Sequence, residues 1–272
     1  MLARFFRRLA TTCPPAAREL GLLREHEDIA QRHARVRTAW ASHVAASRQA
    51  VLEAAERCAH RRRALVIGAG DCLDVPVEEL AERFAEVVLA DIVTSAEVRR
   101  WEKRFPGRVR GVNWDASGAL AALAAVRHTI TAHEAPEIFA RADPGPAPGG
   151  APDFIVSANC ISQLGLVPGH SLPAYDRDKG LPDRCAKAAA RRHLAWLAAQ
   201  PGVRVLLADA ARLDIAADGR QLKKETLHER FGLPKPDRTW RWDLAPIPEW
   251  SPDFHRVHEV GAWIIPAASP GL

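Results

Sequence analysis

The stretch RALVIGAGDCLDVPVEEL, residues 63–80, decides the fold. Its run of small apolar residues predicts a buried strand over residues 64–70, and VEELAERFA predicts a helix over residues 77–85. Gly68 and Gly70 join the two. Glycine takes a positive φ at no steric cost and leaves room for a ligand beside the backbone. A strand, a glycine turn and a helix in this order predict the first unit of an α/β sheet with a ligand site at its edge.

Strands and helices alternate through the rest of the chain. Further strands are predicted over residues 86–93, 108–115, 153–161 and 203–209, and helices over residues 95–105, 117–129 and 185–200. The segment 142–152, ADPGPAPGGAP, predicts a loop. Residues 239–246 and 255–265 are strand-like with no helix between them, which predicts an antiparallel pair. We therefore expect an α/β fold: a doubly wound, mostly parallel sheet of about seven strands with a C-terminal antiparallel hairpin.

The N-terminal part has a different character. Residues 22–58 contain no glycine or proline, and apolar residues recur at helical spacing, which predicts one long helix, or two broken near Ser42, that packs its Trp40 face on the main domain. Residues 1–63 carry a formal charge of +7 and the remainder −2. We expect a helical extension over residues 1–62 and a Rossmann-like domain over residues 63–272. The basic extension is either a solvated helix face or a docking surface for a nucleic acid or an acidic partner.

The composition bears on the cellular compartment, on metal binding and on membrane insertion. The five cysteines show no paired spacing, which favours a reducing cytoplasm over a disulfide framework. HRVH, residues 255–258, lacks a third ligand nearby, so no metal site is expected. No apolar run approaches the roughly 20 residues that cross a bilayer. The basic start MLARFFRRLATTCPPA lacks the apolar core of a secretory signal.

Carboxylates stand where the strands end. Asp91 ends the second strand, where it can accept two hydrogen bonds from a ribose, and Asp115 ends the third, where it can accept one from an adenine amine. A dinucleotide fingerprint would require glycine at Leu73, and Asp71 would repel a pyrophosphate. Asp71 and Asp74 instead suit a ligand with a sulfonium and an ammonium, such as S-adenosylmethionine.

The run Gly68-Ala69-Gly70, the two strand-end acids and DFIVSANC together resemble a class I S-adenosylmethionine-dependent methyltransferase from about residue 63 to the C-terminus. The resemblance implies that the glycine turn holds the methionine and ribose, and that the turn after the fourth strand faces the methyl group. It implies cofactor contacts from Gly68, Ala69, Gly70, Asp71, Asp91, Ile92, Asp115 and Asn159.

The sequence departs from the family pattern in three places. Val66 replaces a usual acid, Cys72 replaces a third glycine, and SANCISQL stands where many amino-group methyltransferases have an NPPY-like motif. LVIGAGD is also similar to the turn of polyamine aminopropyltransferases, which share the fold. The acceptor therefore stays open.

Candidates for catalysis lie after the fourth strand. Asn159 is either a residue that orients the acceptor or a turn-forming asparagine, and Gln163 is expected to face the pocket. Residues 165–184 predict a polar loop that forms a lid or a wall for the acceptor, in which His170 and Tyr175 are either acid–base candidates or structural surface residues. His258 is a further candidate base.

Two other features bear on the acceptor. Cys160 is expected to be a small buried residue and no nucleophile. The tryptophans of the tail are read as core residues or as acceptor contacts: Trp240, Trp242, Trp250 and Trp263.

Three functions follow as hypotheses. The first is a methyltransferase with an unidentified acceptor, a small molecule being favoured over a nucleic acid or protein. The second is a non-catalytic S-adenosylmethionine-binding or assembly protein that docks through its basic extension. The third is an NAD(P)-dependent oxidoreductase, which Leu73 and Asp71 oppose.

Overall fold

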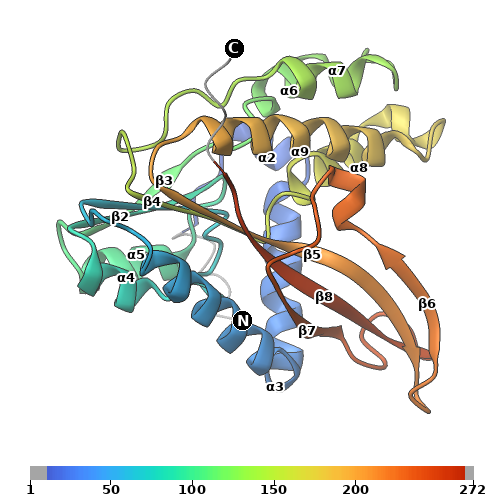
Figure 1. The fold of residues 1–272 in the computed structure, drawn as a ribbon. Coiled ribbons are helices and arrows are strands. Elements are labelled where there is room, and N and C mark those ends of the chain that lie inside the picture. The colour runs from blue at the N-terminus through green and yellow to red at the C-terminus, as the bar shows by residue number, and fades with distance from the viewer. Residues whose placement is uncertain (1–10, 267–272) are drawn as a thin grey trace.

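The computed structural model describes residues 11–266, and within them the chain forms one sheet with helices on both faces (Figure 1). The sheet has eight strands in the order β3-β2-β1-β4-β5-β8-β7, and β6 pairs with β5 beside this path. The strands are β1 (Arg63–Ile67), β2 (Glu86–Asp91), β3 (Val109–Asn113), β4 (Phe154–Ala158), β5 (Val203–Ala216), β6 (Gln221–Thr226), β7 (Arg238–Ala245) and β8 (Phe254–Ile264).

Helices cover the two faces of this sheet in separate groups. The helices are α2 (Pro15–Glu19), α3 (Leu22–Ala55), α4 (Val77–Arg83), α5 (Ala96–Arg104), α6 (Leu120–Val126), α7 (Glu134–Arg141), α8 (Gln163–Ser171) and α9 (Leu181–Ala199), with short 3-10 turns η1 (Pro173–Asp176) and η2 (His228–Phe231). The C-terminal half of α3 packs with α4 and α5 on one face, and α9 packs on the other. Both faces of β1, β2 and β4 are therefore buried, as expected of parallel strands between two helix layers.

The strand directions confirm the predicted architecture. Strands β1 to β5 are parallel, and β8 runs antiparallel to both β5 and β7. This is the doubly wound sheet with a closing antiparallel pair that the resemblance to class I methyltransferases predicts. The strand order reverses between β1 and β4. Ligands of open α/β sheets bind beyond the carboxyl ends of the strands at such a reversal.

The long N-terminal helix is part of the packed structure. Trp40 on α3 is 3% exposed, and its Nε1–H donates to the Leu244 carbonyl at 2.9 Å. Its ring meets Trp242 of β7 edge to face, with centroids 4.9 Å apart. The expected Trp40 contact is therefore confirmed. The helix departs from helical geometry at Val36 (φ −116°, ψ 29°), not near Ser42.

Four elements differ from the expectation. Residues 165–184, expected to be a loop, contain most of α8, the turn η1 and the start of α9. Helix α7 lies between the predicted elements, where neither a helix nor a strand is expected. Strand β5 continues seven residues beyond 209 to Ala216, and β6 turns back on it as an unexpected eighth strand.

One buried acid ties the starts of two central strands together, and it makes stability depend on pH. Asp153 accepts from the Arg62 backbone N–H and from the Arg62 guanidinium, both at 2.7 Å. The Arg62 hydrogen bond lowers the pKa of Asp153 from 3.8 to about 2. A lowered folded-state pKa gives stability that is present above pH about 4 and is lost as the pH falls towards 2.

We expect Asp153→Asn to reduce the free energy of unfolding at pH 7 by about 1 kcal/mol, because the Arg62 side chain is 79% exposed and the pair is partly screened. The variant should also lose part of the stability decline between pH 4 and 2. Urea unfolding at pH 7, 4, 3 and 2 checks both effects. Parallel stability curves for the variant and the wild type would contradict the prediction.

No helix in residues 11–266 combines the length and the apolar character that crossing a bilayer requires.

Candidate functional site

The glycine turn after β1 is built as the sequence predicts. Gly68 has φ 74° and Gly70 has φ 49°, so both occupy the left-handed region. Cys72, at the position of a third glycine, also has a positive φ of 55°. The backbone therefore keeps the glycine-like conformation at Cys72, although a side chain is present there.

The N–H groups of this turn are used within the protein. Those of Gly68 and Ala69 both point to the Ala90 carbonyl, at 3.0 and 3.4 Å. The N–H of Gly70 donates to Asp91 Oδ2 at 2.9 Å, and that of Cys72 donates to the Ala69 carbonyl at 2.7 Å. The turn thus has few donors left for an anionic ligand.

Asp91 lies at the end of β2 and accepts a hydrogen bond from the glycine turn. Its Oδ1 accepts from the Val93 N–H at 2.9 Å, so each carboxylate oxygen has one backbone partner and room for a second. Burial raises the pKa of Asp91 above its ordinary value, and the two backbone hydrogen bonds oppose this. Ser95, not Asp91, caps α5, because its hydroxyl accepts from the Val98 N–H.

Asp115 caps the segment that leads into α6. Its carboxylate accepts from the Ser117 N–H and hydroxyl and from the Leu120 N–H, at 2.9, 2.6 and 2.9 Å. It also lines a cavity of about 70 Å³ next to Gly68 and Ile92. Asp115 is therefore a capping residue that borders the space expected for an adenine.

A second, larger cavity of about 360 Å³ opens over the strand ends and meets the first at Gly68, Asp91, Ile92 and Gln163. It gathers most of the residues expected from the sequence: Gly68, Ala69, Gly70, Asp71, Asp74, Asp91, Ile92, Asn159, Cys160 and Gln163. We call it the central cavity. It lies at the strand-order reversal, where the fold places ligands.

Asn159 occupies a special position in the central cavity. It follows β4 directly and has φ 48°, which is uncommon for a residue other than glycine. Its Nδ2 donates to Asp74 Oδ2, while its Oδ1 is buried without a partner among the described residues. A buried carbonyl oxygen without a partner is costly unless a ligand or water satisfies it.

The far wall of the central cavity was only partly expected. It comes from α3, β5, β7 and β8 and includes His43, Asp209, Arg212, Trp242 and His258. Of the four tail tryptophans, Trp242 and Trp250 line the cavity, Trp240 donates its Nε1–H to His43, and Trp263 lies in the core. His258 was a candidate, whereas Asp209 and His43 were missed. Strand pairing brings Asp209 to the site, and the packing of α3 against β7 brings His43 there.

His170 and Tyr175 lie elsewhere. Neither lines the central cavity or the cavity beside Asp115. His170 is exposed, its Nδ1 lies 2.9 Å from the Leu166 carbonyl, and its ring meets Tyr175 edge to face. We therefore assign neither residue to the site.

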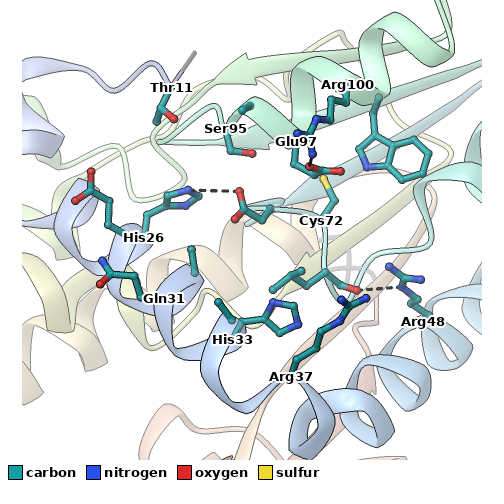
Figure 2. Close-up of a pocket in the computed structure, with 17 residues that line it drawn as sticks. Thr11, His26, Gln31, His33, Arg37, Arg48, Cys72, Ser95, Glu97 and Arg100 are labelled. Carbon is teal, nitrogen blue, oxygen red and sulfur yellow. Dashed lines mark hydrogen bonds and ion pairs between the residues drawn. The ribbon is translucent and has the colours of Figure 1, made fainter. Parts of the chain in front are cut away.

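A third cavity of about 700 Å³ adjoins the central one and lies between α3 and the start of α5 (Figure 2). Both cavities are lined by His26 and Asp71, whose Nε2 and Oδ1 atoms are 3.6 Å apart. Arg48 donates to the Leu73 carbonyl at 3.0 Å and so ties α3 to the glycine turn. Asp71 is thus held by α3 at the border of the two cavities.

The cysteines are unsuited to nucleophilic chemistry. Burial raises the pKa of Cys160 to about 12, and it raises those of Cys58 and Cys185 to about 11 and 12. Burial also raises the pKa of Cys13 and Cys72. Because the thiolate is the reactive form, all five should react slowly in the folded protein.

We expect iodoacetamide at pH 8 to label folded protein at least about tenfold more slowly than protein in 6 M guanidinium, as counted by mass spectrometry. Unfolded protein should take up five labels, since the five cysteines are free. Rapid labelling of Cys160 in the folded protein would contradict this prediction and would make Cys160 a candidate nucleophile.

Within residues 11–266 no three His, Cys, Asp or Glu side chains gather in a geometry that could hold a metal ion. The basic start of the chain lies, up to residue 10, outside the described residues.

Comparisons with known proteins find a likeness among solved structures alone. No family model matches the chain, and no curated protein matches it. Among solved structures it is similar to the 1,6-didemethyltoxoflavin-N1-methyltransferase of Burkholderia thailandensis, crystallised with 1,6-didemethyltoxoflavin and S-adenosylhomocysteine. The two are 17% identical, the match covers 88% of this chain and 86% of that chain, and the TM-score is 0.41. At these values no residue role is carried from one protein to the other.

Proposed function

We propose that this protein binds S-adenosylmethionine in the central cavity and transfers its methyl group to a small-molecule acceptor. The observation that carries the proposal is the glycine turn whose N–H groups are occupied internally while carboxylates surround it. Such a turn suits a nucleoside ligand that has positive charge and no phosphate.

The occupied N–H groups weigh against a dinucleotide. Dinucleotide sites bind the pyrophosphate through free backbone N–H groups at a helix N-terminus. Here the N–H of Gly70 is taken by Asp91, and α4 begins only at Val77. Asp71 and Asp74 would add repulsion. The oxidoreductase hypothesis is therefore disfavoured.

The residues present fit the proposed cofactor. A Cβ built on Gly70 meets no atom within 4 Å, so the turn leaves open space where a ligand can approach the backbone. Asp91 has capacity to accept from ribose hydroxyls, Ile92 and Asp115 border the space proposed for adenine, and Asn159 Oδ1 needs a donor such as an ammonium.

The proposed reaction requires alignment of the methyl donor with the acceptor more than chemical activation of the donor. S-adenosylmethionine supplies a methyl group on a sulfonium, which is already a good leaving group. The chain's own residues hold the ligand at the strand ends, place the acceptor beside Asn159 and keep water out. Residues of α3, β7 and β8 wall this side of the cavity, whose volume of about 360 Å³ favours a small molecule over a folded macromolecule.

The alternative of a non-catalytic docking protein receives less support. Its key feature is the basic extension, yet α3 forms a wall of the central cavity and packs against β7. We therefore propose that residues 1–62 and 63–272 act together as one methyl-transfer unit. The five free cysteines support the proposal that this unit works in a reducing compartment such as the cytoplasm.

Calorimetry with S-adenosylhomocysteine and with NAD tests the proposal. We expect binding of S-adenosylhomocysteine in the micromolar range and no heat from NAD at 1 mM. Binding of NAD, or of neither ligand, would overturn it. Transfer of tritium from labelled S-adenosylmethionine into small molecules of a cell extract then separates an enzyme from a binder.

A further inference from the structure

We propose that Asp209 and His258 form the general base for methyl transfer, and that the acceptor is a planar aromatic ring carrying an acidic O–H or N–H proton. This inference rests on the proposed function and adds to it the acceptor class and the residues that take the proton. It concerns the far wall of the central cavity, which cofactor binding does not use.

Strand pairing places His258 in one row across the sheet with two other residues that line the central cavity. Trp242 on β7 pairs with His258 on β8, and His258 pairs with Arg212 on β5. The β5–β8 register shifts between Asp209 and Ala211, which leaves an extra residue on β5 at this point. Such bulges re-aim side chains next to functional sites. Here the bulge begins at Asp209, whose Oδ1 lies 2.9 Å from His258 Nδ1.

The far wall carries buried polar atoms that the described protein leaves unpaired. His258 is 9% exposed, and its Nε2 has no partner among the described residues. Trp242 Nε1 is unpaired as well. Together with Asn159 Oδ1, these atoms present both donors and acceptors around one cavity. Unpaired buried groups are costly, so their grouping points to a polar ligand that satisfies them.

The shape of the wall specifies a flat ligand. The His43 ring stacks on Trp242 at 4.1 Å with an interplanar angle of 8°, and Trp40 meets Trp242 edge to face. His43 Nδ1 accepts from Trp240 Nε1–H, so the neutral His43 ring carries its proton at Nε2 and can donate. Trp250 extends the aromatic surface of the same cavity. Aromatic walls favour planar rings over saturated ones because stacked rings gain extra contact energy.

The Asp209–His258 pair suits proton removal. With its Nδ1 proton directed to the Asp209 carboxylate, His258 keeps a free lone pair on Nε2. In the step proposed, the acceptor oxygen or nitrogen forms a bond to the methyl carbon while the sulfur–carbon bond breaks and sulfur keeps the electron pair. The acceptor proton passes to His258 Nε2, and Asp209 stabilises the imidazolium that results.

The experiment uses the full chain with defined probes. The probes 1-naphthol and benzimidazole carry an acidic proton on a planar ring, 1-methoxynaphthalene lacks the proton, and cyclohexanol and piperidine lack the planar ring. Saturation-transfer NMR in the presence of S-adenosylhomocysteine measures binding, and tritium transfer from labelled S-adenosylmethionine measures methylation. We expect all three aromatic probes to bind, the two with an acidic proton to be methylated, and the saturated probes to do neither.

Two variants test the base. We expect Asp209→Asn and His258→Phe to lower the transfer rate by about 100-fold or more, with the dissociation constant for S-adenosylhomocysteine changed by less than about threefold. His60→Gln, an exposed histidine outside the cavity, should leave both values unchanged. ¹⁵N NMR should report the Nδ1–H tautomer of His258 in the wild type and its loss in Asp209→Asn, a signature that a merely structural pair would not require.

The outcomes separate the two proposals. If S-adenosylhomocysteine fails to bind the wild type, the proposed function fails. If it binds but saturated probes bind as well as aromatic ones, or no aromatic probe binds at 5 mM, the acceptor class is wrong. If 1-naphthol and benzimidazole bind but are not methylated, or Asp209→Asn transfers methyl at the wild-type rate, Asp209 and His258 are not the base.

Discussion

Replacement of Asp91 by alanine should weaken S-adenosylhomocysteine binding by at least about 100-fold, equivalent to about 2.7 kcal/mol. The carboxylate sits at the end of β2, where its spare acceptor capacity faces the central cavity. Loss of two charge-assisted hydrogen bonds to a ribose accounts for an effect of this size. The substitution also removes the hydrogen bonds that Asp91 accepts from the Gly70 and Val93 N–H groups, which destabilises the turn proposed to hold the ligand.

Calorimetry on Asp91→Ala measures this effect, with Asp218→Ala as the matched control. Asp218 lies on the exposed β5–β6 turn and should leave the affinity unchanged. Cooperative thermal unfolding of Asp91→Ala would show that the fold persists. An unchanged affinity in a folded Asp91→Ala protein would mean that the cofactor assignment of this cavity is wrong.

Alanine substitutions at Gly68 and Gly70, two glycines of the same turn, should have different effects on stability and on ligand binding. At Gly68 an added Cβ would lie 2.7 Å from the Ala158 carbonyl oxygen and 2.7 Å from Cys160 Cβ, with φ at +74°. Because the carbonyl belongs to the end of a central strand, it has little freedom to move. We expect Gly68→Ala to lower the free energy of unfolding by about 3 kcal/mol or more, through overpacking and backbone strain together.

Gly70→Ala should separate binding from stability. Its φ is +49° and nothing lies within 4 Å of an added Cβ, so only the cost of the left-handed backbone remains, about 1 kcal/mol. The new methyl group would occupy cavity space, and we expect the affinity for S-adenosylhomocysteine to fall about tenfold or more. Urea unfolding and calorimetry on both variants check the pair. Equal losses of stability, or full affinity in Gly70→Ala, would contradict this reading.

The grouping of the residues proposed to bind the cofactor could be predicted because its sequence signals are local. Gly68, Gly70 and Asp91 lie within 24 residues, and each follows a buried strand whose apolar run is plain in the sequence. The carboxyl ends of neighbouring parallel strands meet at one edge, so the grouping follows once the strands are recognised.

Helix α8 was missed because tertiary packing overrides its composition. Gly165, Pro168 and Gly169 argue against a helix in isolation. In the structure a Cβ at Gly165 would lie 2.3 Å from the Cys185 carbonyl, and one at Gly169 would lie 2.7 Å from Pro182 Cα. The glycines are therefore needed where α8 approaches α9 closely, and burial against α9 compensates for their poor helix propensity.

Helix α7 and strand β6 have local signals in the sequence. Thr131 and Glu134 form a reciprocal capping box at the start of α7, which reads as T-x-x-E in the sequence. Asp218-Gly219 between the runs that become β5 and β6 is a strong hairpin signal. By contrast, the meeting of Asp209, Trp242 and His258 depends on long-range strand pairing and a register shift, which no local pattern encodes.

The contact between Trp40 and Leu244 joins positions 204 residues apart and has a consequence for biosynthesis. The wall proposed for the acceptor needs α3, made early, together with β7 and β8, made after every other strand. A nascent chain that has emerged only as far as β5 already contains the glycine turn and its acids, but lacks the part of the cavity wall that comes from β7, β8 and the segment between them. The proposed methyl transfer should therefore begin only after translation has passed β8.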